Sequence, residues 1–192
     1  GVTLDEITYH TRCVKSGLKA SILMIDLPKD SYNTKFKAYK NANKFILTRL
    51  ADLIKIEIDV NNLDIAKYLI EKNIPLCAHI GLLPQTIKSR SGYRKYGKSK
   101  HEAKQLYDLA ISLDKLGVQL ILIECLENSL AKRISENCNA PVIGIGSGRG
   151  IDGQVAVIYD LLGISFNKID GFFKNDKTSL DKQIAEFRKK LK

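Results

Sequence analysis

The sequence predicts an α/β fold of the TIM (β/α)8 type, with about six of the eight strand–helix units of such a barrel within its 192 residues. Short apolar segments alternate with helical segments, which is typical of parallel strands joined by right-handed crossovers. The apolar segments are nearly continuous, as in a sheet covered by helices. Polar residues follow nearly every predicted strand, at the end where barrel active sites are built.

An open, doubly wound sheet is the alternative fold, because it shows the same alternation. It gathers its site at one switch point, however, and does not need polar residues at nearly every strand. A typical barrel has about 250 residues. We therefore expect one barrel domain over 1–192 that is incomplete at its N-terminus, with about two further units upstream of Gly1.

The first half of the chain is expected to hold three helices and three strands. Thr3-Leu4-Asp5-Glu6 has the form of a capping box, and Gly17 suits the end of the helix that it opens. Apolar and helical periodicity then predicts a strand over Ala20–Leu27, a helix over about Asn33–Leu50, a strand over Leu53–Glu57, a helix over Asn61–Lys72 and a strand over Pro75–His79.

The second half begins with a long polar loop over Gly81–Ser99, in which 88–100 is expected to be a mobile basic loop. A basic helix is expected at the C-terminus, within 176–192. The elements between them are a helix over His101–Leu116, a strand over Leu120–Cys125, a helix over Asn128–Glu136 and strands over Pro141–Gly146 and Gln154–Tyr159.

Composition narrows the class of protein. The net charge is +10, but the basic residues lie mostly in two segments and no nucleic-acid recognition motif accompanies them, so we expect no nucleic-acid partner. No apolar run approaches the roughly 20 residues that span a bilayer, and no signal peptide opens the sequence. The four cysteines form no C-x-x-C pair, which favours reduced thiols in a cytoplasmic protein.

Charged residues interrupt the apolar strands near their ends. Side chains alternate along a strand, so Lys55 and Glu57 share one face, and Glu124 shares the face of Leu122. Asp26 and Glu57 are hard oxygen ligands of the kind that hold Mg²⁺. The alternative is an Asp before a proline turn and a Glu paired with Lys55.

Three further features have two interpretations each. Glu124 ends an aliphatic strand and suits a general base, or else accepts hydrogen bonds from backbone amides. His79 is either a substrate ligand or a structural hydrogen-bonding residue. The glycines of Gly144–Gly150 are weak as a dinucleotide motif, because they do not satisfy G-x-G-x-x-G, and reasonable as a tight turn that lets the backbone approach a ligand. Together the strand ends predict a metal-assisted enzyme that removes a proton next to a carbonyl group.

At these strand ends the chain resembles the ketopantoate hydroxymethyltransferase (3-methyl-2-oxobutanoate hydroxymethyltransferase) family. The matching stretches follow the family's order over nearly the whole chain, up to about residue 175. They are Ile7–Thr11, Ile25–Pro28, Ser31-Tyr32, Ile54–Glu57, Pro75–Gln85, Gly92-Tyr93, Leu122–Cys125, Ala131–Ile134, Pro141–Gly148, Asp152–Gln154 and Asp160–Ile164.

The resemblance implies transfer of a one-carbon unit from 5,10-methylenetetrahydrofolate to 3-methyl-2-oxobutanoate, giving ketopantoate for pantothenate synthesis. By position, Asp26 and Glu57 match the family's Mg²⁺ ligands, with Asp26 also beside the substrate. Lys55 matches a residue that contacts the keto acid, and Glu124 matches the proton acceptor. The resemblance also implies a homo-oligomer, commonly a decamer. The charge of the basic loop would suit the acidic tail of the folate, with Lys95 and Lys98 as the lysines to test.

The chain departs from the family pattern in three places. The remaining metal ligand of the family, an Asp followed by a Ser that contacts the keto acid, lies on a segment that this sequence does not include. Ile58-Asp59 replaces the small glycines that usually follow the metal-binding Glu, and Lys29-Asp30 stands where the family tends to be apolar. A truncated or degenerate relative without activity, or another Mg²⁺-dependent enolate enzyme acting on an oxo acid, is therefore the alternative.

Overall fold

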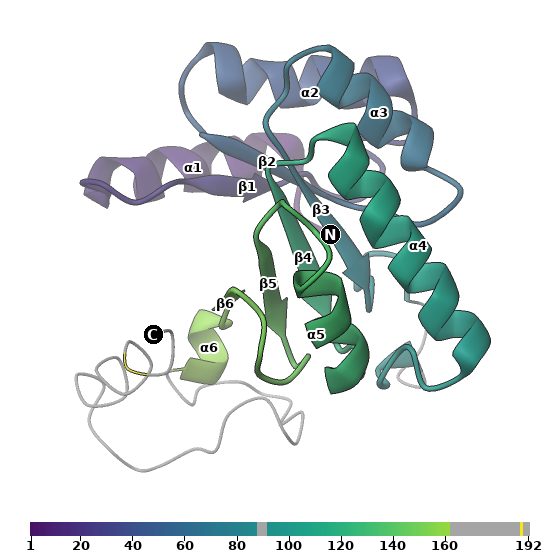
Figure 1. The fold of residues 1–192 in the computed structure, drawn as a ribbon. Coiled ribbons are helices and arrows are strands. Elements are labelled where there is room, and N and C mark those ends of the chain that lie inside the picture. Colours follow the sequence, from purple (N-terminus) through teal and green to yellow (C-terminus); the bar gives the residue numbers. More distant parts are fainter. Residues whose placement is uncertain (88–91, 162–188, 190–192) are drawn as a thin grey trace.

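A computed structural model describes residues 1–87, 92–161 and 189 and shows a single sheet of six parallel strands (Figure 1). The strands lie in the sheet in the same order as in the sequence, each hydrogen-bonded to the next. They are β1 (Met24–Asp26), β2 (Leu53–Glu57), β3 (Leu76–Gly81), β4 (Leu120–Glu124), β5 (Val142–Ile145) and β6 (Gly153–Gln154).

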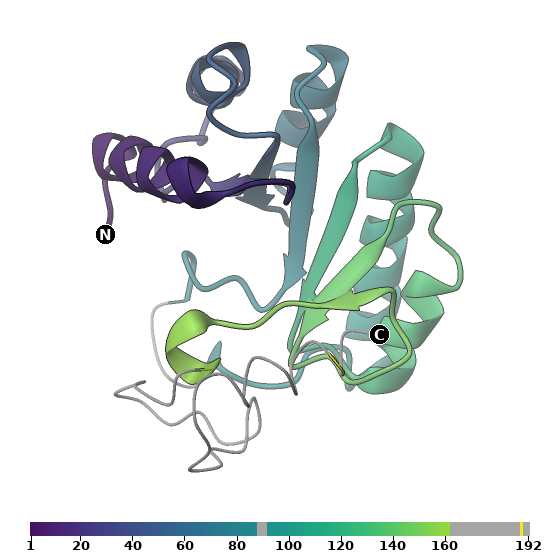
Figure 2. The same ribbon diagram turned by 90° about the vertical axis from the view of Figure 1, so that its left-hand side faces the viewer.

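Helices cover the convex side of the sheet, which curls into about half of a barrel (Figure 2). They are α1 (Leu4–Gly17), α2 (Lys35–Leu47), α3 (Leu63–Glu71), α4 (Lys100–Leu116) and α5 (Asn128–Ser135). The short helix α6 (Ile158–Leu161) follows β6 and does not lie on that side (Figure 2). A doubly wound sheet would reverse its strand order at a switch point. The unbroken order and the curl confirm the predicted partial barrel and exclude the open sheet.

Local chemistry sets the element ends that the sequence predicts best. The Thr3 hydroxyl accepts a hydrogen bond from the Glu6 N–H, and the Glu6 carboxylate accepts one from the Thr3 N–H, so the capping box forms. Gly117 follows α4 in the left-handed conformation, at φ 90°, and its N–H bonds Asp114 O. Strand β2 has the predicted bounds, Leu53–Glu57.

The last predicted strand, over Gln154–Tyr159, is wrong in length. Gln154 pairs with Gly144, so only Ile145 of β5 remains beside the residues that follow. The chain then leaves the sheet and enters α6, and Val157 and Tyr159 are 44% and 60% exposed. Their apolar character therefore does not mark a strand. Strand β1 is also shorter than predicted.

The two faces of the sheet differ in composition. The convex face packs against the helices in the main core, in which Ile54, Ile56, Ile121 and Ile123 are fully buried beside Phe45 of α2. A smaller apolar cluster of Leu53, Cys77 and Leu122 lies on the opposite, concave face. The polar strand residues stand beyond that cluster, toward the C-terminal strand ends.

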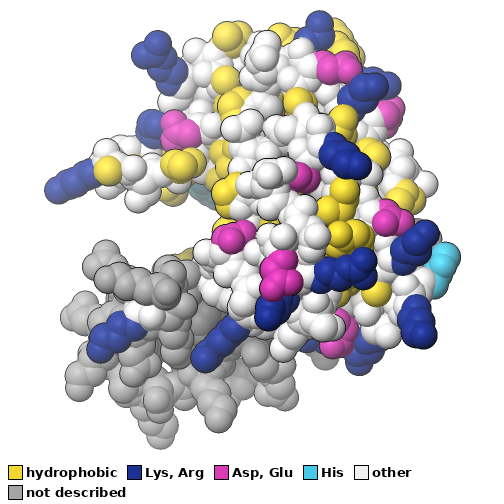
Figure 3. Space-filling view, in the orientation of Figure 1, with side chains coloured by type: hydrophobic (Ala, Val, Ile, Leu, Met, Phe, Trp, Pro, Cys, Tyr) yellow, Lys and Arg dark blue, Asp and Glu magenta, His cyan; other side chains and the backbone are white. Residues whose placement is uncertain are grey.

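Several predictions concern parts that the structure does not describe. Residues 88–91 of the basic loop and the C-terminal helix of 176–192, apart from Lys189, lie outside the described residues. Within the described ranges, no helix is both long and apolar enough to cross a membrane. On the face drawn in Figure 3, lysines and arginines are scattered among acidic side chains rather than gathered in one patch.

Candidate active site

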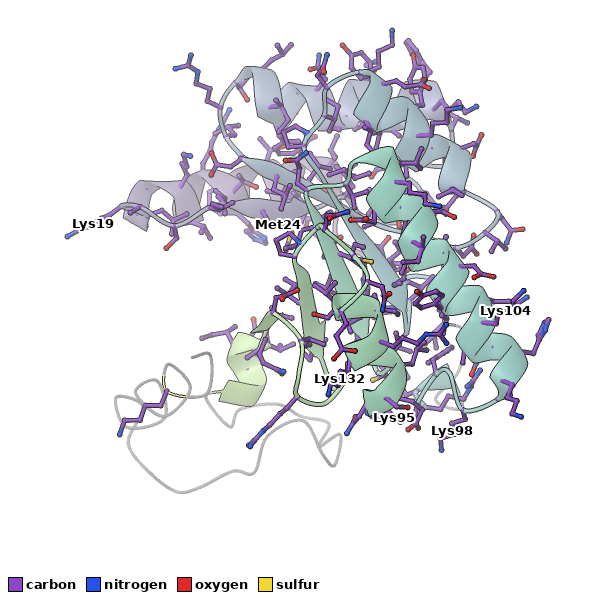
Figure 4. All side chains as sticks on the ribbon, in the orientation of Figure 1. Lys19, Met24, Lys95, Lys98, Lys104 and Lys132 are labelled. Carbon is purple, nitrogen blue, oxygen red and sulfur yellow. The ribbon has the colours of Figure 1, made fainter. Side chains whose placement is uncertain are left out.

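Five polar side chains of four adjacent strands share the concave face: Asp26, Lys55, Glu57, His79 and Glu124. The strand register explains this, because Asp26 lies beside Lys55 and Glu57 beside His79 in neighbouring strands. Gly81, two residues after His79, lies beside Glu124. Figure 4 labels Met24, two residues before Asp26, on this side of the sheet. All predicted site residues therefore come to one end of the sheet.

Four of these side chains form a continuous chain of contacts across the strands. Lys55 Nζ lies 2.8 Å from Asp26 Oδ2 and 3.5 Å from His79 Nδ1. His79 Nε2 lies 3.1 Å from Glu124 Oε2. Acid, ammonium, imidazole and acid thus alternate across the mouth of the half-barrel, and each group faces one of complementary character.

His79 is the buried centre of this chain, with a side chain that is 3% exposed. Burial lowers the pKa of His79, so the imidazole is neutral at pH 7. The ammonium of Lys55 can only donate, which makes Nδ1 the acceptor and leaves the proton on Nε2, toward Glu124. The Nε2–Glu124 pair is close without meeting hydrogen-bond angles, so Nε2 has no satisfied partner. In this protonation state Nδ1 of His79 faces the ammonium of Lys55, and the proton on Nε2 faces Glu124.

Glu57 is the most deeply buried acid of the site, at 3% exposed. Its Oε1 accepts a hydrogen bond of 2.9 Å from the Gln85 N–H, whereas its Oε2 is buried without a partner. Burial raises the pKa of Glu57 to about 7, against the lowering effects of the Gln85 bond and of Lys55. A carboxylate in this position gains from any cation that reaches its free oxygen.

The donor set fits a divalent ion in part. Asp26 Oδ1 and Glu57 Oε2 are both buried oxygens without a hydrogen-bond partner. Two hard oxygen ligands completed by water or substrate oxygens are typical of Mg²⁺. Among the described residues, however, no group of three or more His, Cys, Asp or Glu side chains is placed to hold a metal. Asp26 and Glu57 are thus two carboxylates that each present one unpartnered oxygen, fewer than a complete set of ligands.

A cavity of about 700 Å³ opens beside Glu57, between the loops that follow β1, β2 and β3. Glu57, Tyr32, Asn61 and Gln85 line it. Its other charged side chains are two lysines and three acids: Lys29, Lys35, Asp30, Asp59 and Asp64. Cavities of about 300–1,000 Å³ hold ligands of drug size. The cavity is therefore larger than a small keto acid needs.

The structure also reveals residues to which the sequence assigned no role. The Gln85 side chain donates to Leu27 O at 3.0 Å and accepts from the Tyr32 hydroxyl at 2.9 Å, so it ties together two of the loops around the cavity. Ser147 is 1% exposed, and its hydroxyl accepts from the Leu126 N–H at 3.1 Å. Both lie in loops, where no periodicity marks them.

Comparison with known proteins agrees with the resemblance of the strand ends. The family model for ketopantoate hydroxymethyltransferase matches residues 1–192. The chain is 42% identical over 174 residues to the 3-methyl-2-oxobutanoate hydroxymethyltransferase of Aliivibrio fischeri (strain MJ11), which covers 91% of this chain and 66% of that protein. It is 40% identical over 191 residues to the protein of the same name from Shewanella sediminis (strain HAW-EB3), covering 100% and 70%.

The chain therefore spans about two thirds of the length of the curated relatives that it matches. Among solved structures it is similar to a sugar phosphate isomerase/epimerase from Parabacteroides distasonis, with 10% sequence identity and a TM-score of 0.38 over 64% of this chain and 55% of that one. A similarity of this size carries no argument about function.

Proposed function

The chain belongs to the ketopantoate hydroxymethyltransferase family, and we propose that it carries the site that transfers a hydroxymethyl group from 5,10-methylenetetrahydrofolate to 3-methyl-2-oxobutanoate. The observation that carries this proposal is the contact chain Asp26–Lys55–His79–Glu124, with Glu57 beside it. It supports the proposal because the residues proposed as base, substrate contact and metal ligands all lie at one end of the sheet.

Glu124 is the proposed proton acceptor. The substrate has one acidic C–H bond, at C3 next to the keto group. Transfer of that proton to Glu124 leaves an enolate whose C3 attacks the methylene carbon of the folate, while water supplies the hydroxyl oxygen and tetrahydrofolate leaves. The Glu124 side chain is 16% exposed, so the substrate can reach it. His79 Nε2 lies 3.1 Å from Glu124 Oε2, so the imidazole stands beside the proposed base at the mouth of the half-barrel.

Lys55 is the proposed contact for the keto acid. Its side chain is 14% exposed and already pairs with Asp26 Oδ2, which fixes the ammonium at the mouth. His79 Nδ1 accepts a second proton, and a carboxylate or keto oxygen of the substrate would accept the third. Asp26 and Glu57 would hold Mg²⁺, which when bound supplies the charge that stabilises negative charge developing on the keto oxygen.

The cavity beside Glu57 supports the use of a second, larger substrate. Glu57, one of the two proposed metal ligands, lines this cavity. The cavity volume of about 700 Å³ suits a drug-sized ligand such as a folate. Amide and hydroxyl groups line it, as a heterocycle rich in N–H and C=O groups requires. We therefore assign this cavity to the folate donor.

The direct test is formation of ketopantoate by the purified full-length protein, supplied with both substrates and Mg²⁺. We expect product only when the folate donor is present, and loss of product when the divalent ion is chelated. Consumption of the oxo acid that is independent of folate would indicate another enolate reaction, such as carbon–carbon lysis. A non-catalytic relative would form no product and, in calorimetric titration, would bind neither Mg²⁺ nor the keto acid.

A further inference from the structure

The Lys95 ammonium donates all three of its protons in hydrogen bonds to oxygen atoms of two neighbouring loops. Its Nζ donates to Leu126 O at 3.0 Å, to Asn128 Oδ1 at 3.2 Å and to Gly146 O at 2.7 Å. An ammonium group has three donors. Lys95 is therefore saturated, and its charge ties the loop after β3 to the C-terminal ends of β4 and β5. Figure 4 labels Lys95 in this region.

The backbone next to Lys95 reinforces this connection. Tyr96 forms a parallel bridge with Leu126, in which the Tyr96 N–H donates to Cys125 O and the Glu127 N–H donates to Tyr96 O, both at 2.8 Å. On its other side the loop is attached to α4, where Arg94 and the Gly97 N–H both bond the Glu102 carboxylate. Lys95 therefore projects from a segment that is held at both ends.

The segment to which Lys95 binds begins at Cys125, one residue after Glu124. Its first residue has an unfavourable backbone conformation. Cys125 has φ 55°, in the left-handed region that non-glycine residues rarely occupy. Such a conformation persists only where its surroundings enforce it. Ser147 restrains the turn from one side by accepting from the Leu126 N–H, and Lys95 restrains it from the other by binding Leu126 O.

From this geometry we infer that Lys95 is a positioning residue for Glu124. The ammonium holds the left-handed turn at Cys125, and that turn fixes where β4 ends and the direction in which the Glu124 carboxylate points. The inference rests on the proposed function, in which Glu124 accepts the substrate proton. The inference also gives Lys95 and Lys98 different roles. Lys98 is exposed and makes no ion pair with any residue in the described ranges, so it alone of these two lysines stays available to a folate tail.

The test compares Lys95→Met with Lys104→Met, a change at an exposed lysine of α4, in the full-length protein. A misplacement of about 1 Å at a catalytic group costs up to about 100-fold in rate. We expect Lys95→Met to lower kcat by roughly 10- to 100-fold and to leave the KM of the keto acid within about twofold, because substrate binding does not need the base. Lys104→Met should keep the wild-type kcat, because Lys104 makes only an exposed pair with Asp108 on the same helix.

Rescue distinguishes positioning from a general loss of stability. Glycine adopts a positive φ without strain, so Cys125→Gly should keep the turn in place when Lys95 is replaced. We expect the double variant Lys95→Met/Cys125→Gly to regain most of the kcat lost by Lys95→Met. A loss of kcat that Cys125→Gly does not restore, or a rise in the folate KM without a change in kcat, would overturn the inference.

Two further measurements cover other outcomes. If Lys95→Met does not fold, Asn128→Ala removes one of the three acceptors and should lower kcat in the same direction by a smaller factor; an unchanged kcat would count against the inference. Amide hydrogen exchange over 123–127 needs no activity. It should become faster in Lys95→Met and not in Lys104→Met, and equal exchange in the two variants would overturn the inference. A wild-type protein that makes no ketopantoate would instead refute the proposed function.

Discussion

At the scale of single residues, Glu57 is a carboxyl group whose burial opposes its ionisation. It is 3% exposed, one of its oxygens has no partner, and its pKa is raised from 4.5 to about 7. In the folded protein it therefore takes up a proton at a pH where the unfolded chain has already lost it. Its contribution to folding is fully present below about pH 4.5 and is lost as the pH rises through about 7.

This predicts a pH-dependent difference between the wild type and Glu57→Gln in metal-free protein. Between pH 5 and 8 the free energy of unfolding of the wild type should fall relative to the variant by up to about 3 kcal/mol. Urea denaturation at several pH values measures it. Mg²⁺ should make this fall smaller in the wild type, because a bound cation stabilises the charged form of the Glu57 carboxylate. Glu71→Gln, at an exposed position of α3, is the control and should show no such trend.

The same residue shows what the sequence can reveal. Alternation alone places Lys55 and Glu57 on one face of a strand, and the structure has them there. The Gln85 N–H and the Lys95 ammonium could not be predicted, because their partners are set by loop conformations and lie 28 and 31 residues or more away. Periodicity does not carry that information.

At the scale of elements, the site depends on close contact between the ends of β3 and β4. Gly81 ends β3 at φ 97°, beside Glu124 in the register. A Cβ atom there would collide with the Leu126 side chain and with the carbonyl oxygen of Glu124. The backbone is equally engaged, since the Leu82 N–H donates to that oxygen at 2.9 Å. Only glycine lets the two strands meet in this way.

Gly81→Ala should therefore destabilise the protein by more than about 2 kcal/mol, since the left-handed conformation alone costs an L-residue roughly 1–2 kcal/mol before the collision is counted. The displacement also reaches Glu124, so activity should fall more than the stability loss explains. Gly17→Ala is the matched control, because nothing lies within 4 Å of a Cβ built there. Thermal denaturation of both variants measures the effect, and equal melting temperatures would contradict the account.

Element boundaries show where sequence patterns work and where they fail. Capping chemistry is local, so the start of α1 at Leu4 and the end of α4 before Gly117 follow from neighbouring residues. The length of β6 is set by β5, which ends at Ile145 and offers no further partner. The apolar residues after Gln154 therefore look like a strand in the sequence but do not form one.

At the scale of the whole molecule, the order of the strands carries the functional argument. A sheet in which every strand lies beside its neighbour in the sequence brings all C-terminal strand ends to one mouth. This is why residues as far apart as Asp26 and Glu124 belong to one contact chain. The alternation of strands and helices predicts this arrangement, but it does not determine which individual charges pair, such as Lys55 with Asp26.

The central claim is that Glu124 removes the C3 proton of 3-methyl-2-oxobutanoate, and proton exchange tests it most directly. The measurement is loss of the C3–H signal in D₂O, followed by NMR, with the full-length protein and Mg²⁺. The wild type should catalyse the exchange, and Glu124→Gln should slow it by at least about 100-fold, as expected when a general base is lost. Glu127→Gln, on the same loop, should keep the wild-type rate. Exchange by Glu124→Gln at the wild-type rate would contradict the account.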